Sequence, residues 1–215
     1  MADGGVINGE RVARDVIAVG ASAGGIEALS ALLAPLPAKL PAAILIVIHR
    51  SPFFEGNLPA VLGRRTAMPV AEPHRGESLV RGRVYVAPRD QHLVVDDGRL
   101  TVHRGPKQHH TRPAVDPLFE SVAASHANRA VGVLLSGGGD DGVHGLLRIK
   151  AAGGLSLVQD PREALHPSMP RSAILYDHVD AVLPLAEMAA TIEALALGRC
   201  VELARTPLVG SGNGV

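Results

Sequence analysis

The sequence predicts an α/β fold, a doubly wound and mostly parallel sheet with helices on both faces and an antiparallel β-ribbon. Short β-branched runs alternate along the chain with longer Ala/Leu-rich segments, which is typical of parallel strands joined by crossover helices. Apolar residues make up 47% of the 215 residues, enough for one hydrophobic core, whereas aromatic residues contribute only 2%. The core is therefore expected to consist of Val, Leu, Ile and Ala.

The first half of the chain shows two strand–helix units. A Gly-rich turn follows the first strand-like run, and Pro35 and Pro37 end the helical pattern after it. Residues 43–48 are apolar throughout, as expected for a strand buried on both faces. These signals predict strands at residues 15–19 and 43–48 and helices at residues 26–33 and 58–65.

The middle of the chain predicts the antiparallel ribbon. Three short strand-like runs occur at residues 84–87, 91–95 and 99–103, and the last two are separated by a turn that contains Asp97 and Gly98. Asp-Gly between alternating strands is a strong hairpin signal. The remaining predicted elements are helices at residues 117–125, 143–152 and 187–196 and strands at residues 129–135 and 155–159.

The charge balance argues against a nucleic-acid partner. Lys plus Arg and Asp plus Glu each number 21, and broad binding to nucleic acid needs clustered positive charge. Few aromatic residues also means few stacking platforms for single strands. The one cysteine, Cys200, excludes an intrachain disulfide framework and a Cys-based zinc site.

No targeting signal is visible. The first residues contain no apolar stretch of signal-peptide type, and the longest clean apolar run, residues 42–48, is far shorter than a membrane span. A cytoplasmic location without direct membrane insertion is therefore expected. We expect residues 1–14 to be a flexible segment, residues 15–199 to form one domain and residues 200–215 to be a flexible tail. No oligomeric state is predicted.

Three chemically active side chains follow buried strands of the predicted sheet. Ser22 follows the first, His49 follows the second, and the pair Asp140 and Asp141 follows the strand at residues 129–135. Ligands of doubly wound sheets bind beyond the carboxyl ends of the strands. A hydroxyl, an imidazole and a carboxylate at three such ends are the parts of a nucleophilic triad.

Each signal also has a structural explanation. Residues 20–24 read Gly-Ala-Ser-Ala-Gly, a G-x-S-x-G turn that exposes a serine hydroxyl, but such a turn can simply let a helix pack closely on a strand. His49 could be a surface loop residue, and Asp141 a turn residue or helix N-cap. The coincidence of all three favours the triad. Its chain order, Ser-His-Asp, differs from the Ser-acid-His order of α/β-hydrolases and predicts a different fold.

Together these motifs resemble the catalytic domain of the bacterial chemotaxis protein-glutamate methylesterase family, CheB. The resemblance extends over roughly residues 15–196, and several motifs in matching order are more specific than any one alone. It is carried by residues 19–25 (Val-Gly-Ala-Ser-Ala-Gly-Gly), the strand that ends at His49, residues 112–119 (Arg-Pro-Ala-Val-Asp-Pro-Leu-Phe), residues 135–142 (Leu-Ser-Gly-Gly-Gly-Asp-Asp-Gly) and the later motifs within residues 159–173.

The resemblance implies hydrolysis of glutamyl methyl esters on the cytoplasmic helices of methyl-accepting chemoreceptors, with release of methanol, and deamidation of receptor glutamines. It places the nucleophile on Ser22, the base on His49 and the acid on Asp141. No cofactor and no metal are expected. Backbone N–H groups of Ala23, Gly138 and Gly139 are candidate oxyanion donors or shape the site.

The basic segment at residues 107–112 has two interpretations. It can be a solvated loop, or it can contact an acidic receptor helix. Arg112 is the candidate for substrate contact, because it begins the family-like Arg-Pro segment.

Two features depart from the family pattern. Gly138 and Asp140 stand where the family usually has Met and Asn, which predicts a wider pocket and an extra carboxylate able to perturb its neighbour or His49. About a dozen residues precede the first predicted strand, where the familiar enzyme has a phosphoryl-receiver domain. We therefore expect a stand-alone catalytic domain.

Two other functions compete with a methylesterase. One is a catalytically silent signalling or scaffold domain, which only the changes at Gly138 and Asp140 favour. The other is a nucleotide-binding domain that uses residues 20–25 as a phosphate loop, but this segment lacks the G-x-G-x-x-G spacing and the Gly-Lys-Ser/Thr ending.

Overall fold

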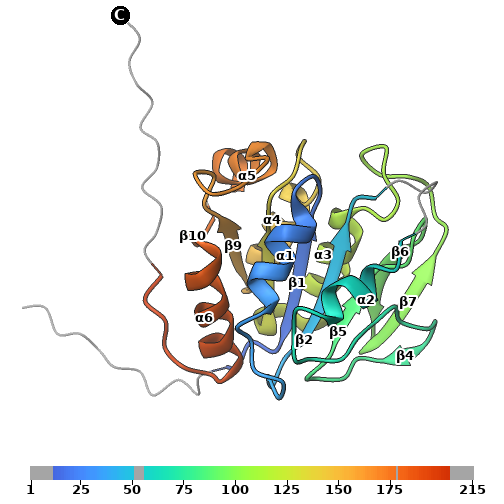
Figure 1. Ribbon diagram of the computed structural model, residues 1–215, viewed down its shortest axis with the longest axis horizontal. Coiled ribbons are helices and arrows are strands. Elements are labelled where there is room, and N and C mark those ends of the chain that lie inside the picture. The colour runs from blue at the N-terminus through green and yellow to red at the C-terminus, as the bar shows by residue number, and fades with distance from the viewer. Residues whose placement is uncertain (1–11, 51–55, 178, 204–215) are drawn as a thin grey trace, which may run out of the picture.

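A computed structural model of the protein describes residues 12–50, 56–177 and 179–203 (Figure 1). In these residues the strands form one seven-stranded sheet and one three-stranded sheet. In chain order they are β1 (Val16–Ala21), β2 (Ala43–Ile48), β3 (Val70–Ala71), β4 (Glu77–Ser78), β5 (Val84–Val86), β6 (His92–Asp96), β7 (Arg99–His103), β8 (Ala130–Leu134), β9 (Leu155–Gln159) and β10 (Ala181–Leu183).

The large sheet has the order β10-β9-β8-β1-β2-β5-β3, and every neighbouring pair in it is parallel. The chain builds outward from β1 through β2 and β5, then returns to β8 on the other side of β1. A ligand crevice is expected where the direction of building reverses, beside the carboxyl end of β1. The small sheet, β4-β7-β6, is antiparallel. The predicted α/β fold is thus confirmed.

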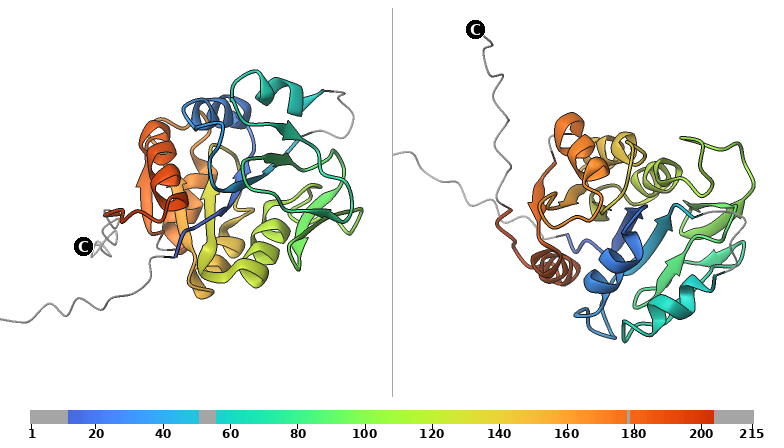
Figure 2. Two further views of the ribbon diagram at one scale, coloured as in Figure 1. Left: turned by 90° about the horizontal axis from the view of Figure 1, so that it is seen from below. Right: turned by 45° about the horizontal axis from the view of Figure 1, so that its top comes forward.

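Helices cover both faces of the parallel sheet (Figure 2). Side chains alternate along β1, so that Ile17 and Val19 pack with α1, α2 and α6, whereas Val16 and Ala18 pack with α3, α4 and α5. None of the helices in the described ranges has the length and apolarity needed to cross a membrane. The helices are α1 (Gly25–Leu33), α2 (Leu58–Gly63), α3 (Val115–His126), α4 (Val143–Ala151), α5 (Ser168–Asp177) and α6 (Leu185–Ala196).

Most predicted elements are present, with one correction. The apolar run at residues 84–87 was assigned to the ribbon, but β5 pairs in parallel with β2 and is fully buried, so it belongs to the large sheet. The ribbon is instead the β6–β7 hairpin, extended by β4. Within the described residues, five elements were not predicted: β3, β4, α5, β10 and a short 3₁₀ helix, Ala127–Arg129. The predicted flexible ends fall mostly outside the described residues.

Helices α3 and α4 approach each other closely because α4 has a glycine at the contact. A Cβ atom on Gly145 would lie 2.4 Å from Cβ of Phe119 in α3, which is too close for any larger residue. The preceding turn is equally tight, because Gly142 has a φ of 98° and a Cβ there would lie 2.8 Å from Val115. The amino ends of α3 and α4 are therefore brought side by side, close to the end of β8.

A buried carboxylate links the amino ends of β1 and β8. Asp15, directly before β1, is 1% exposed and accepts two hydrogen bonds of 2.8 Å from Nε and one terminal nitrogen of Arg129. Arg81 pairs with it as well. Burial tends to raise the pKa of Asp15, but the hydrogen bonds and charges of the two arginines outweigh this and hold the pKa below its usual value.

The variant Arg129→Ala is expected to lower the free energy of unfolding at pH 7 by about 1–3 kcal/mol, because Asp15 loses charge-assisted hydrogen bonds. A group with a lowered folded-state pKa contributes stability above its unfolded pKa, about 3.9, and loses it as the pH falls through the folded-state pKa. The difference from the wild type should therefore shrink below about pH 4. Urea unfolding between pH 3 and pH 7 measures it, and a difference that does not change with pH would contradict this account.

Candidate active site

The carboxyl ends of β1, β2 and β8 lie next to one another, because these strands are neighbours in the sheet. Ser22 directly follows β1 and His49 directly follows β2, while Asp141 lies in the turn between β8 and α4. The turns are joined by backbone hydrogen bonds of 3.0 Å, from Ser22 N–H to the carbonyl of Ser136 and from His49 N–H to that of Ala21. The sheet therefore brings the three predicted residues to one edge.

Asp141 is directly paired with His49. Nε2 of the imidazole lies 2.7 Å from Oδ2 of the carboxylate, and Asp141 is only 2% exposed. The carboxylate also accepts backbone hydrogen bonds from Val115 (2.7 Å) and Asp116 (3.0 Å) at the start of α3. Burial tends to raise the pKa of Asp141, but hydrogen bonds from His49 and from these two N–H groups hold it below its usual value. Asp141 is thus an ionised acceptor that orients the imidazole.

Ser22 and His49 line the same cavity, of about 300 Å³. In the described part of the chain no hydrogen bond joins the Ser22 hydroxyl to the imidazole. In enzymes without substrate, hydrogen bonds between catalytic groups are often long, and they tighten when substrate binds. Since Nε2 is held by Asp141, Nδ1 is the imidazole nitrogen left to accept a proton. Apolar side chains form much of the cavity wall: Ile26, Ile48, Leu58 and Val61.

Backbone N–H groups beside Ser22 are available to an oxyanion. Within residues 12–50, 56–177 and 179–203, the N–H groups of Ala23, Gly138 and Gly139 donate to no protein acceptor, whereas that of Gly137 donates to the His166 carbonyl. These groups lie in the turns after β1 and β8. A Cβ atom on Gly138 would meet no atom within 4 Å, so there is open space beside this residue, where a methionine side chain is usual in the family.

Thr111 is a site residue that the sequence did not reveal. Its hydroxyl oxygen lies 3.4 Å from Nε2 of His49, on the side where the imidazole meets Asp141. The hydroxyl donates to the carbonyl of Gln108 (3.0 Å), so it can act as a second, weaker acceptor for the imidazole N–H. Only its place next to Arg112 in the basic segment could have drawn attention to it.

Arg112 contacts other parts of the protein. Its guanidinium donates to Asp90 (2.8 Å) and to the carbonyl of Gly105 (2.7 Å), which anchors the loop that carries Thr111. With His49 and Lys107 it also lines a second cavity, of about 230 Å³. Arg112 is therefore both an anchor of this loop and part of a basic wall beside the imidazole.

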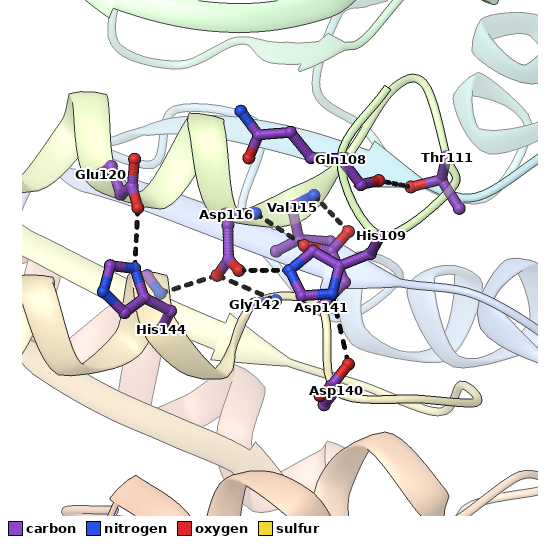
Figure 3. Close-up of polar contacts among 12 residues, drawn as sticks. Gln108, His109, Thr111, Val115, Asp116, Glu120, Asp140, Asp141, Gly142 and His144 are labelled. Atoms are coloured by element: carbon purple, nitrogen blue, oxygen red, sulfur yellow. Dashed lines mark hydrogen bonds and ion pairs between the residues drawn. The ribbon is translucent and has the colours of Figure 1, made fainter. Parts of the chain in front are cut away.

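The extra carboxylate, Asp140, faces His109 and not His49. Oδ1 of Asp140 lies 3.3 Å from Nδ1 of His109 (Figure 3), and the Asp140 side chain is 68% exposed.

Three nearby side chains have a spacing that could hold a metal ion. One ligand atom each from His109, Asp116 and Asp141 lies within 4.8 Å of the others. The carboxylates of Asp116 and Asp141 already accept hydrogen bonds from backbone N–H groups and from imidazoles, and a bound ion would have to replace these hydrogen bonds.

This chain is similar to several known proteins. The family model described as CheB methylesterase matches residues 17–192. A protein-glutamate methylesterase/protein-glutamine glutaminase of Symbiobacterium thermophilum is 38% identical over 185 residues, which cover 86% of this chain and 51% of that protein. A relative of the same name from Photorhabdus laumondii is 41% identical over 177 residues, covering 80% of this chain and 50% of the relative.

A solved structure shows the same fold. The crystal structure of the Thermotoga maritima CheB methylesterase catalytic domain is 30% identical in sequence and superposes with a TM-score of 0.80. The match covers 86% of this chain and 100% of that domain. This chain spans about half the length of the curated relatives it matches.

The variant Asp141→Asn is expected to keep the fold, because its amide oxygen can still accept one of the two hydrogen bonds from the start of α3. It should slow the reaction of Ser22 with an activated ester by about 10³- to 10⁴-fold, because the amide cannot stabilise a charged imidazole. Stopped-flow hydrolysis of the ester measures the rate, and circular dichroism checks the fold. A folded variant that reacts as fast as the wild type would exclude Asp141 as the acid.

Proposed function

The chain belongs to the CheB methylesterase family, and from this we propose that it hydrolyses methyl esters of glutamate side chains in chemoreceptors. The reaction releases methanol and leaves the glutamate carboxylate. The observation that carries the proposal is the 2.7 Å pairing of His49 with buried Asp141, beside a cavity that Ser22 shares. The names of the relatives support deamidation of receptor glutamines as a second reaction of the same site.

The first half of the proposed reaction forms an acyl-enzyme. The Ser22 hydroxyl oxygen attacks the ester carbonyl while Nδ1 of His49 takes the hydroxyl proton. Asp141 stabilises the resulting imidazolium through the Nε2–H hydrogen bond. The carbonyl oxygen becomes an oxyanion, for which the unpaired N–H groups of Ala23 and Gly138 are the proposed donors. The intermediate then breaks the bond to the methoxy group, which takes the proton from His49 and leaves as methanol.

The second half restores the enzyme. A water molecule gives a proton to Nδ1 of His49 and attacks the carbonyl of the Ser22 ester. The second tetrahedral intermediate breaks its bond to the serine oxygen, which recovers its proton from the imidazolium. The product leaves as the carboxylic acid, which gives its proton to solvent and becomes the glutamate carboxylate. For a glutamine substrate the same steps release ammonia in place of methanol.

The two cavities beside His49 suit the two parts of such a substrate. A glutamyl methyl ester is uncharged. The cavity lined by both Ser22 and His49 has largely apolar walls, which suit such a group. The second cavity, which His49 also lines, has basic residues such as Lys107, His110 and Arg112 in its wall, together with one carboxylate, Asp90. We propose that this basic wall contacts an acidic segment of a receptor's cytoplasmic helix, which places the activity in the cytoplasm.

The variant Ser22→Ala is expected to lower methanol release from methylated chemoreceptor membranes by about 10³-fold or more, because the nucleophile is lost. The matched control is Ser30→Ala in α1, a serine whose hydroxyl, among the described residues, donates to the backbone carbonyl of Ile26 and to no other group. Gas chromatography of the released methanol measures both. Equal release by Ser22→Ala and the wild type would remove Ser22 from the mechanism. Release by neither would favour another ester or amide substrate, or a silent domain.

The variant Arg112→Ala is expected to raise KM for the receptor several-fold, with a smaller effect at 0.5 M salt, because salt screens attraction between exposed charges. Hydrolysis of a small neutral ester should stay within about twofold of the wild type if Arg112 acts on the receptor. Steady-state kinetics on both substrates measure this. An equal loss on both substrates would mean that Arg112 acts through the loop that it anchors to Asp90.

A further inference from the structure

We propose that Asp116 and His109 form a second aspartate–histidine pair that holds Asp141 in place, which makes both of them positioning residues for hydrolysis. The inference rests on the proposed function, because it concerns the same reaction. It concerns residues outside the Ser22, His49 and Asp141 set and depends on the way α3 and α4 meet (Figure 3).

The two buried aspartates cap each other's helices. Asp141 lies just before α4, yet it accepts hydrogen bonds from N–H groups at the start of α3. Asp116 lies in the first turn of α3, yet Oδ1 accepts hydrogen bonds from Gly142 (3.0 Å) and Gly145 (2.7 Å) at the start of α4. Neither helix has a side-chain cap from its own N-cap residue, Ala114 or Gly142. The exchanged carboxylates therefore satisfy N–H groups that would otherwise lack partners.

This exchange fixes the position of Asp141. A shift of the turn before α4 away from α3 would stretch both sets of hydrogen bonds, those accepted by Asp141 and those accepted by Asp116. The contact has no spare space either, because a Cβ on Gly145 would lie 3.1 Å from Oδ1 of Asp116. Asp116 thus acts on the imidazole of His49 only through Asp141.

His109 balances the charge of this arrangement. Its Nε2 lies 3.0 Å from Oδ2 of Asp116 and its Nδ1 lies 3.3 Å from Oδ1 of Asp140. Burial and the charge of Asp141 raise the pKa of Asp116, and the charge of His109 acts against this rise. When Asp116 and Asp140 are both ionised, their carboxylates can only accept, so both contacts are satisfied when both imidazole nitrogens carry protons. Burial tends to lower the pKa of His109, but the charges of Asp141, Asp116 and Asp140 outweigh it and raise the pKa. The cation also reduces the repulsion between Asp116 and Asp141.

A tight turn carries His109. His109 and His110 have φ values of 48° and 61°, and they lie between Gln108 and Thr111, whose backbones exchange hydrogen bonds of 2.8 and 3.1 Å. A two-residue turn of this kind requires a positive φ at both central positions, so the turn accounts for both angles. It holds the His109 imidazole against the carboxylates of Asp116 and Asp140.

The same two helices offer a matched control. Nδ1 of His144 in α4 lies 2.8 Å from Oε1 of Glu120 in α3, so this too is a carboxylate–imidazole pair between the helices (Figure 3). Its side chains are 64% and 42% exposed, and neither makes a hydrogen bond to Asp141 or His49 in the described residues. Breaking this pair tests whether the loss of any contact between α3 and α4 lowers the rate at which Ser22 reacts.

The experiment compares Asp116→Asn, His109→Ala, His109→Gln and the control Glu120→Gln in the full chain. The amide of Asp116→Asn keeps an oxygen for the α4 N–H groups but loses the charge, and the amide of His109→Gln keeps one donor for Asp116. One readout is the rate at which a fluorophosphonate labels Ser22, followed by intact mass. The other is kcat and KM for a small activated ester, with melting curves to confirm folding.

Asp116→Asn and His109→Ala are expected to lower the labelling rate and kcat by about 10- to 100-fold, with KM within about twofold, as is usual when a partner of a catalytic group is lost. His109→Gln should recover only part of the loss, because it restores a donor for Asp116 but not the positive charge, and Glu120→Gln should match the wild type. If Asp116→Asn does not fold, the two His109 variants decide the question.

The outcomes separate this inference from the proposed function. A wild type that the probe does not label would refute the serine mechanism itself. A labelled wild type with unchanged rates in folded Asp116→Asn and His109→Ala would overturn the positioning role alone. An equal loss in Glu120→Gln would also overturn it, because general docking of α3 on α4 would then explain the effect.

Discussion

The hydrogen bonds that Asp141 accepts from the start of α3 are the interaction on which the rest of the site depends. They hold a buried carboxylate ionised at the carboxyl edge of the sheet, at 2.7 Å from His49. Burial alone would favour the protonated acid, and these two hydrogen bonds act with the one from His49 to oppose it. The parallel sheet supplies the remaining geometry. Since β8, β1 and β2 are neighbours, the residues that follow them share one edge, and each enters the site from a turn fixed by backbone hydrogen bonds.

Close packing makes this interaction possible. The amino ends of α3 and α4 meet because Gly145 leaves room for Phe119, and because Gly142 adopts a backbone conformation that brings the turn under Val115. The same approach lets Asp116 reach the N–H groups of α4. Steric fit in the core and electrostatics at the site are therefore two aspects of one contact between helices.

Much of the fold and part of the site could be predicted from the sequence, because both depend on local patterns. The continuous apolar run of β2 and the Gly-rich turn after β1 are visible in the letters, and so are Ser22 and His49 directly after strands. What could not be predicted depends on contacts between distant segments. The run that became β5 has strand character in either sheet, and only its pairing with β2 decides which. The approach of Thr111 to His49 and the capping of α4 by Asp116 likewise arise only when the loops are in place. The roles of Ser22, His49 and Asp141 in the reaction remain proposals, tested by the variants described above.

The exchanged caps of α3 and α4 also have a consequence for how this region opens. Each helix receives its cap from the other, so neither amino end has its N–H groups satisfied while the two are apart. Separating the helices exposes the amides of Val115, Asp116, Gly142 and Gly145 in a single event. These amides therefore belong to one cooperative opening unit and share one opening free energy. Fraying of either amino end would break hydrogen bonds that cap the other helix, so the pairing of Asp141 with His49 is as durable as the contact between the two helices.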